Sequence, residues 1–89
     1  MIFMRTIDRS TSFKRDFKKH GEIEAALIEV LYKLLNDEAL PDKYRDHSLT
    51  GDWLGYRECH IKPDLLLIYK QSDENTLRLA RLGSHSELF

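Results

Sequence analysis

The clearest periodic pattern lies between residues 23 and 34, where apolar side chains recur at intervals of three and four residues. This spacing places them on one face of an α-helix, which we expect to pack against a hydrophobic core. The helix should end before Pro41, since proline cannot continue a helix. The stripe consists of Ile23, Ala26, Leu27, Val30, Leu31 and Leu34.

A second, narrower stripe predicts a helix just before this one. Phe13 and Phe17 are one helical turn apart and are flanked by basic side chains. Ser10 or Ser12 provides an N-cap for this helix, and Gly21 is expected to end it.

Strand patterns dominate the second half of the chain. Residues 56–61, 64–70 and 76–82 are strand-like and are joined by turns at residues 62–63 and 72–75, which predicts a three-stranded antiparallel meander. Residues 2–8 are predicted to form a first strand that joins this sheet. The order β-α-α-β-β-β predicts a single α+β domain over residues 1–89, with an antiparallel sheet and both helices on one face. The uncovered face is where we expect a site.

Composition narrows the class of protein further. The 89 residues are 42% hydrophobic and 33% charged, which is typical of a folded globular chain. The longest apolar run, residues 65–69, is far below the ~20 residues that span a bilayer, and the first residues show no signal-peptide stretch. We therefore expect a cytoplasmic protein with no membrane partner. The single cysteine, Cys59, excludes an internal disulfide and a thiolate zinc cage.

Charge is distributed unevenly although its total is only −1. Residues 5–20 carry six Lys/Arg and two Asp, or +4, whereas residues 21–42 carry one Lys and six Asp/Glu, or −5. The basic stretch predicts a local surface for RNA, with Lys14 and Lys18 as candidate contacts. The competing interpretation is a solvated helix face.

The residues best suited to chemistry lie in the second half. His47, His60 and His85 are accompanied by Asp64 and Arg81, and the meander should bring His60, Asp64 and Arg81 to one end of the sheet. Imidazoles can serve as base and acid near neutral pH, and a guanidinium binds phosphate. Together they match metal-free RNA cleavage, in which a base takes the 2′-hydroxyl proton and an acid protonates the departing 5′-oxygen.

Two other interpretations of the same residues remain. Each histidine could be an ordinary surface residue. His47, His60, Asp64 and His85 could instead bind zinc or iron, but no close-spaced histidine signature is present, so we predict neither a metal nor another cofactor.

Motifs from Tyr44 onward resemble a known family. They are Tyr44-Arg45-Asp46-His47-Ser48-Leu49-Thr50-Gly51, Gly55-Tyr56-Arg57, His60 with Pro63-Asp64, Arg81-Leu82-Gly83-Ser84-His85, and Leu88-Phe89. This set of motifs resembles that of the YafQ branch of the RelE-like toxins, within the RelE/ParE superfamily of bacterial type II toxin–antitoxin systems. The resemblance extends in pattern over nearly the whole chain.

The resemblance implies a RelE-like microbial RNase fold and a ribosome-dependent endoribonuclease, or mRNA interferase, that cuts mRNA during translation. It implies a DinJ-like ribbon-helix-helix antitoxin as partner, with operator DNA bound only through the antitoxin complex. By the same resemblance, His47, His60 and Asp64 are the candidates for general base, Arg81 is the phosphate clamp, His85 the general acid, and Phe89 an aromatic that places the substrate. Alternatives are a ParE-like toxin without nuclease activity and an inactive partner that only binds antitoxin.

Overall fold

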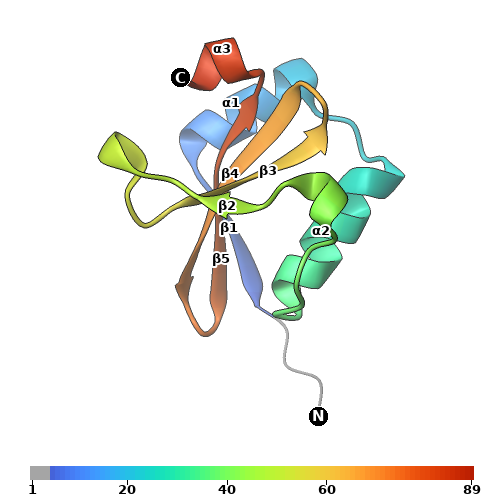
Figure 1. Ribbon diagram of the computed structural model, residues 1–89, viewed down its shortest axis with the longest axis vertical. Helices are drawn as coiled ribbons and strands as arrows, with labels where there is room; N and C mark the ends of the chain where they lie inside the picture. Colours follow the sequence, from blue (N-terminus) through green and yellow to red (C-terminus); the bar gives the residue numbers. More distant parts are fainter. Residues whose placement is uncertain (1–4) are drawn as a thin grey trace.

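The computed structural model describes residues 5–89, which form a sheet of five strands in the order β1-β5-β4-β3-β2 (Figure 1). The strands are β1 (Thr6–Arg9), β2 (His47–Ser48), β3 (Arg57–Lys62), β4 (Leu65–Asp73) and β5 (Thr76–Gly83). The helices are α1 (Thr11–His20), α2 (Ala25–Leu35) and α3 (His85–Leu88), with two 3₁₀ turns, η1 (Asp42–Tyr44) and η2 (Gly51–Trp53). The predicted α+β fold is confirmed.

Two details of the sheet and one helix differ from the sequence prediction. β1 pairs with β5 in parallel, with Thr6 opposite Thr76, so the sheet is only mostly antiparallel. No hairpin joins β1 to β5, and therefore no turn fixes their relative direction. The short β2 and the helix α3 were not expected at all. Of the predicted first strand, residues 2–4 lie outside the described residues.

The helices α1 and α2 cover one face of the sheet and form the main core with it. The residues of this core are Phe13, Leu27, Val30, Leu34, Tyr44, Cys59, Ile61, Leu67, Tyr69, Leu77, Leu79 and Leu82. The predicted stripe of α2 therefore faces the core, except at Ile23, which is 79% exposed. That part of the prediction was wrong because α2 begins only at Ala25, so Ile23 belongs to the connection before it.

The first helix is fixed at both ends by local contacts. Ser10 Oγ accepts a hydrogen bond from the Phe13 N–H at 2.9 Å and donates one to the Ala80 carbonyl at 2.7 Å, so the N-cap also attaches α1 to β5. At the other end, a Cβ on Gly21 would lie 2.1 Å from the Phe17 ring, so only glycine fits there. The N-cap at Ser10 and the end at Gly21 are as predicted.

The opposite face of the sheet carries a smaller apolar cluster. Its buried members are Leu66, Ile68, Ala80 and Leu88, with Leu49, Trp53 and Tyr56 packed against them. The segment around η2 and the helix α3 thus cover parts of this face and leave the rest accessible. Within residues 5–89, no helix combines the length and apolarity that crossing a membrane requires.

Two neighbouring positions on α2 test this assignment of the core. Leu27 is 6% exposed and Ile28 is 54% exposed. We expect Leu27→Ala to lower the free energy of unfolding by about 2–5 kcal/mol, because it leaves a cavity in the core. Ile28→Ala should change it by about 0.5 kcal/mol or less. Urea denaturation of both variants measures this, and equal losses would contradict the packing described here.

Candidate functional site

The candidate site lies on the face of the sheet opposite α1 and α2. One cross-strand row joins His47 to Glu58, Glu58 to Ile68, and Ile68 to Arg81. Paired residues of neighbouring strands lie on the same face. The row therefore places His47 next to Glu58, and Arg81 on the same face beyond the buried Ile68.

A β-bulge puts Arg81 on this face. Leu77 and Leu79 of β5 face the helices, so strict alternation would turn residue 81 toward the helices as well. The register between β4 and β5 instead shifts between Ile68 and Tyr69, so that Ile68 pairs with Arg81 and Tyr69 with Leu79. A bulge of this kind redirects the side chains that follow it.

A buried carboxylate connects the two strand histidines. Glu58 is 4% exposed. Its Oε1 lies 3.7 Å from His47 Nε2 and 3.4 Å from His60 Nε2. Glu58 was absent from the sequence-based candidates, although its place two residues before His60 in a strand already put both on one face.

The segment that carries His47 is held by a separate polar contact. Asp46 accepts hydrogen bonds from the Arg57 guanidinium, at 3.0 Å from Nη2, and from the Tyr69 hydroxyl. Burial, followed by the hydrogen bond to Asp46, raises the pKa of Tyr69. His47 Nδ1 in turn lies 2.7 Å from the Arg45 carbonyl oxygen. A carbonyl only accepts, so the proton sits on Nδ1 and Nε2 faces the site.

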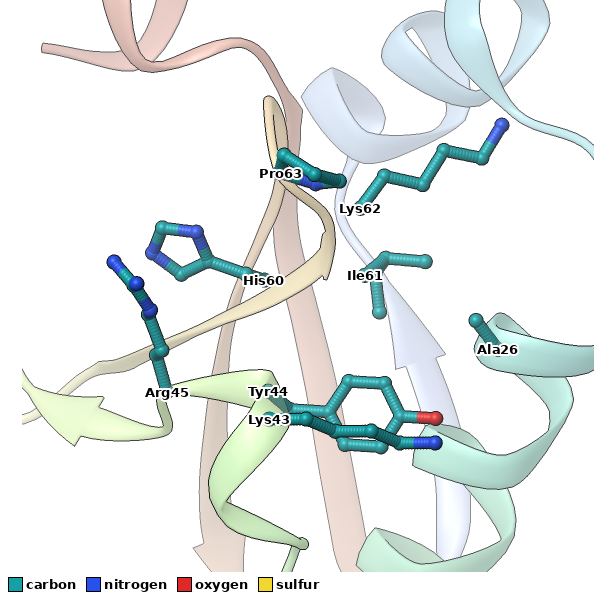
Figure 2. A pocket seen from close by; sticks show the side chains of 8 residues that line it. All are labelled: Ala26, Lys43, Tyr44, Arg45, His60, Ile61, Lys62 and Pro63. Carbon is teal, nitrogen blue, oxygen red and sulfur yellow. The ribbon is translucent and has the colours of Figure 1, made fainter.

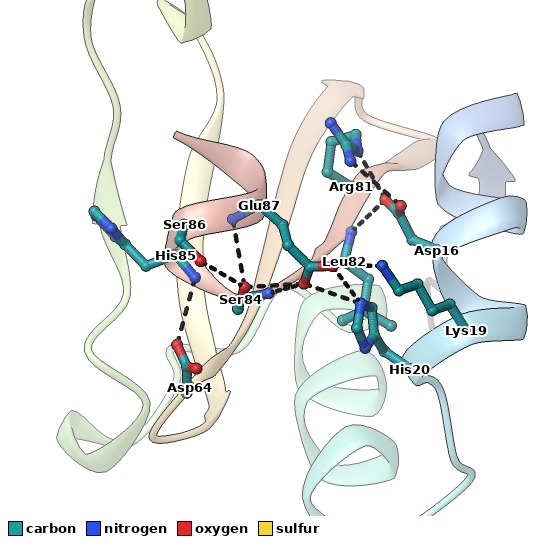
Figure 3. A network of polar contacts seen from close by, with 10 residues as sticks. All are labelled: Asp16, Lys19, His20, Asp64, Arg81, Leu82, Ser84, His85, Ser86 and Glu87. Atoms are coloured by element: carbon teal, nitrogen blue, oxygen red, sulfur yellow. Dashed lines mark hydrogen bonds and ion pairs between the residues drawn. The ribbon is translucent and has the colours of Figure 1, made fainter.

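Arg81 is bound to α1 through Asp16, a nearly buried residue (Figure 3). Asp16 Oδ2 accepts from Arg81 Nε at 2.7 Å and from the Leu82 backbone N–H at 3.0 Å. Burial alone raises the pKa of the Asp16 carboxyl, but the hydrogen bonds from Arg81 and Leu82 and the Arg81 charge outweigh it, and the net pKa is lowered. The contact fixes the guanidinium beside the row of site residues.

The helix α3 is also tied to α1. Ser84 and Glu87 form a capping box, in which Ser84 Oγ accepts from the Glu87 N–H and Glu87 Oε1 accepts from the Ser84 N–H. Glu87 Oε2 lies 2.8 Å from Lys19 Nζ and 3.0 Å from His20 Nε2 (Figure 3). The Lys19 hydrogen bond, together with those from Ser84 and His20, lowers the pKa of Glu87. The Ser-x-x-Glu spacing was the sequence signal for this helix.

The anchored α3 carries the last two candidate residues. The His85 backbone N–H lies 3.4 Å from Asp64 Oδ1, a long contact that nonetheless brings α3 against the β3–β4 turn. The rings of His85 and Phe89 are 5.1 Å apart at their centroids and tilted by 35°. Both residues are exposed, and Phe89 is 52% accessible.

The contacts described above connect some of the predicted residues with one another and leave others apart. His47 and His60 share Glu58, Asp64 contacts the backbone of His85, and Arg81 completes the row of His47 and Glu58. Lys14 and Lys18 are exposed on α1, and no described contact joins them to these residues. Among residues 5–89, no group of three or more histidine, cysteine, aspartate or glutamate side chains is arranged to hold a metal ion.

Comparison with known proteins identifies the family. Residues 5–89 match the family described as bacterial toxin of type II toxin-antitoxin system, YafQ. The chain belongs to the YafQ toxin family. The resemblance predicted from the motifs is therefore confirmed.

Individual relatives and solved structures match the chain over almost its whole length. The mRNA interferase toxin YafQ of Escherichia coli K12 is 36% identical, with 99% of each chain covered. The E. coli DinJ–YafQ complex contains a chain that is 38% identical, with a TM-score of 0.79 and 96% and 98% of the two chains covered. A metal-bound toxin from Helicobacter pylori is 49% identical, with a TM-score of 0.84 and 97% and 100% covered.

The lowered pKa of Asp16 gives a prediction about acid stability. The usual value is 3.8, so the unfolded chain binds this proton more readily than the folded one. The contribution of the ionised Asp16 carboxyl to the free energy of unfolding is therefore complete above the pKa that this carboxyl has in the unfolded chain. It is lost as the pH falls through the lower pKa that the carboxyl has in the folded protein. We expect Asp16→Asn to be less stable than wild type near neutral pH, with the difference shrinking below about pH 4. Urea denaturation across this pH range measures it, and a difference independent of pH would contradict the assigned role.

Proposed function

We propose that this YafQ-family chain is an mRNA interferase, an endoribonuclease that cleaves messenger RNA on the ribosome by metal-independent acid–base catalysis. The observation that carries the proposal is the shared face on which β2, β3 and β5 present His47, His60 and Arg81, with α3 holding His85 near Asp64. These are the group types that an attack of a 2′-hydroxyl on the neighbouring phosphate needs. The name of the E. coli relative supports the same activity.

In the proposed reaction a base removes the 2′-hydroxyl proton, and the oxygen forms a bond to phosphorus. The bond from phosphorus to the 5′-oxygen breaks, and that oxygen takes a proton from His85. The products are a 2′,3′-cyclic phosphate and a 5′-hydroxyl, so atoms and charge balance without a cofactor. Arg81 neutralises the charge that develops on the phosphoryl oxygens.

Three groups are candidates for the base, namely His47, His60 and Asp64. The Nδ1 contact of His47 with the Arg45 carbonyl leaves Nε2 as its proton acceptor. The Nε2 atom of His60 lies 3.4 Å from Glu58 Oε1, closer than the Nε2 atom of His47. A carboxylate at this distance stabilises the imidazolium that forms when either histidine takes the proton.

The remaining residues are assigned to binding. Phe89, beside the His85 ring, offers a surface on which a base can stack. The exposed Lys14 and Lys18 on α1 supply positive charge for ribosomal RNA. DinJ–YafQ complexes support a DinJ-like ribbon-helix-helix antitoxin as the partner of this chain, with operator DNA bound through the complex. A cytoplasmic location follows from this role.

Replacing His85 tests the proposal directly. We expect His85→Gln to slow cleavage of ribosome-bound message by about 100-fold or more, because proton transfer contributes at least that much. Wild-type protein that is freed of metal with EDTA, and then of EDTA, before ribosomes are added should still cleave, and it should leave 2′,3′-cyclic phosphate ends. Primer extension with purified ribosomes measures the rate, and end-group analysis identifies the product.

Ser86→Ala is the matched control, since Ser86 is exposed on the same helix and contacts only the Ser84 hydroxyl. It should cleave at the wild-type rate. Loss of cleavage by the protein freed of metal beforehand, with recovery when a transition metal is added back, would favour a metal-dependent site. Growth inhibition that persists in His85→Gln would favour a toxin without nuclease activity, and an inert wild type would favour a partner that only binds antitoxin.

A further inference from the structure

A cavity of about 410 Å³ lies beside His60, between η1, the end of β3 and the start of α2 (Figure 2). Its lining includes Lys43, Tyr44, Arg45, His60, Ile61 and Lys62. The volume falls within the range of about 300–1,000 Å³ that is usual for sites of small ligands. The reaction proposed above uses only His60 of this lining.

The cavity exists because β2 is short. Within the described sheet, β2 pairs only with Arg57 and Glu58 of β3, so the part of β3 that follows has no strand neighbour on this side. His60, Ile61 and Lys62 therefore border an open space instead of another strand. Tyr44 closes its floor, being buried in the main core.

The cations around this cavity are not equivalent. Lys43 Nζ lies 3.7 Å from a Glu29 carboxylate oxygen, and Lys62 Nζ lies 3.3 Å from one of Glu24. In Figure 2 the Lys43 side chain points toward α2, and the Arg45 guanidinium and the His60 ring lie at the opposite end of the cavity from the ammonium groups of both lysines. No ion pair of the described residues includes Arg45, which is exposed. The uncompensated positive charge is thus on the side of the cleavage site.

Arg45 adopts a backbone conformation that its residue type rarely takes. Its φ of 51° and ψ of 42° place it in the left-handed region, which is unfavourable for a residue with a Cβ. Its N–H closes the η1 turn on the Asp42 carbonyl, and its own carbonyl contacts His47 Nδ1 at 2.7 Å. One residue in this conformation thus contacts His47 through its backbone and lines the cavity of His60 through its side chain. Strained residues of this kind cluster at functional sites.

We propose that this cavity is a second phosphate subsite, in which Arg45 binds the backbone phosphate of the nucleotide next to the one that is cleaved. The inference rests on the proposed function and extends it to the neighbouring nucleotide. The planar guanidinium offers paired N–H donors to phosphate oxygens, and no carboxylate among residues 5–89 competes for them. Arg81 differs in this respect, since Asp16 already occupies its Nε and Nη2. The two arginines would hold successive phosphates on either side of the histidines.

The kinetic test separates binding from chemistry. We expect Arg45→Gln to raise KM for ribosome-bound message by about tenfold, the effect of losing a charge-assisted hydrogen bond, with kcat nearly unchanged. Arg45→Lys should recover part of the loss. Arg45→Gly should match Arg45→Gln, because glycine accepts the left-handed conformation and removes only the guanidinium. Unchanged KM in Arg45→Gly would overturn the proposal.

Arg9→Gln is the matched control, an exposed arginine on β1 at the other edge of the sheet, also without a described ion pair. Arg9→Gln should keep the wild-type KM. If KM rises as much in Arg9→Gln as in Arg45→Gln, Arg45 contributes only general attraction of positive charge to RNA, and the subsite is overturned. The binding test uses the free protein and a trinucleotide in which 2′-deoxy sugars precede both linkages, so that it cannot be cleaved and carries one phosphate for each arginine. Amide NMR shifts should appear at Arg45 and Lys62 and be lost in Arg45→Gln. Shifts elsewhere only would overturn the subsite. The NMR test does not depend on cleavage. If the wild type cleaves no message but shows these shifts, the proposed function is contradicted and the subsite is not.

Discussion

The carboxylate of Asp16 connects the hydrophobic core to the open face of the sheet. It projects from α1, is nearly buried, and binds both the side chain of Arg81 and the backbone of Leu82. Removing Arg81 would leave the nearly buried Asp16 carboxylate without its charged partner, which destabilises the fold. The position of α1 on β5 and the position of the Arg81 guanidinium are therefore set by the same contact. A change at Arg81 is consequently a change in stability as well as in charge at the site.

The same helix supports the C-terminal part of the site by a different kind of contact. Lys19 and His20 reach Glu87 on α3, the short helix that carries His85 and Phe89. These ion pairs are partly exposed and so contribute less than the contact of Asp16. Their value lies in restricting where α3 sits, because a helix of one turn is not stable by itself. The N-terminal helix thus positions residues that are more than sixty places away in the sequence.

The other half of the site depends on the edge of the sheet. Asp46 binds Arg57 and Tyr69 and so attaches the short β2 to β3, which brings His47 to Glu58. Because β2 ends after two residues, it also leaves the cavity beside His60 open. The proposed function assigns the histidines of this arrangement to the reacting nucleotide, and the proposed subsite assigns the cavity to the nucleotide next to it.

Local pattern was enough to predict most of the elements. The period of α2, the N-cap at Ser10, the end of α1 at Gly21 and the three long strands all depend on interactions within a few residues, which a sequence records directly. The motifs likewise identified the family and the candidate site residues. Ile23 was assigned wrongly because its hydrophobicity fits the helical period while the helix begins two residues later.

Only the tertiary structure decided how these pieces meet. The parallel pairing of β1 joins residues seventy positions apart, Thr6 and Thr76. The bulge that turns Arg81 to the open face follows from the register between β4 and β5, which a local pattern does not fix. The partners of the site residues, Asp16, Glu58 and Glu87, are ordinary acidic residues in the sequence and acquire their roles from burial and proximity. Charge and periodicity are properties of short segments, whereas burial and long-range pairing exist only once the whole chain has packed.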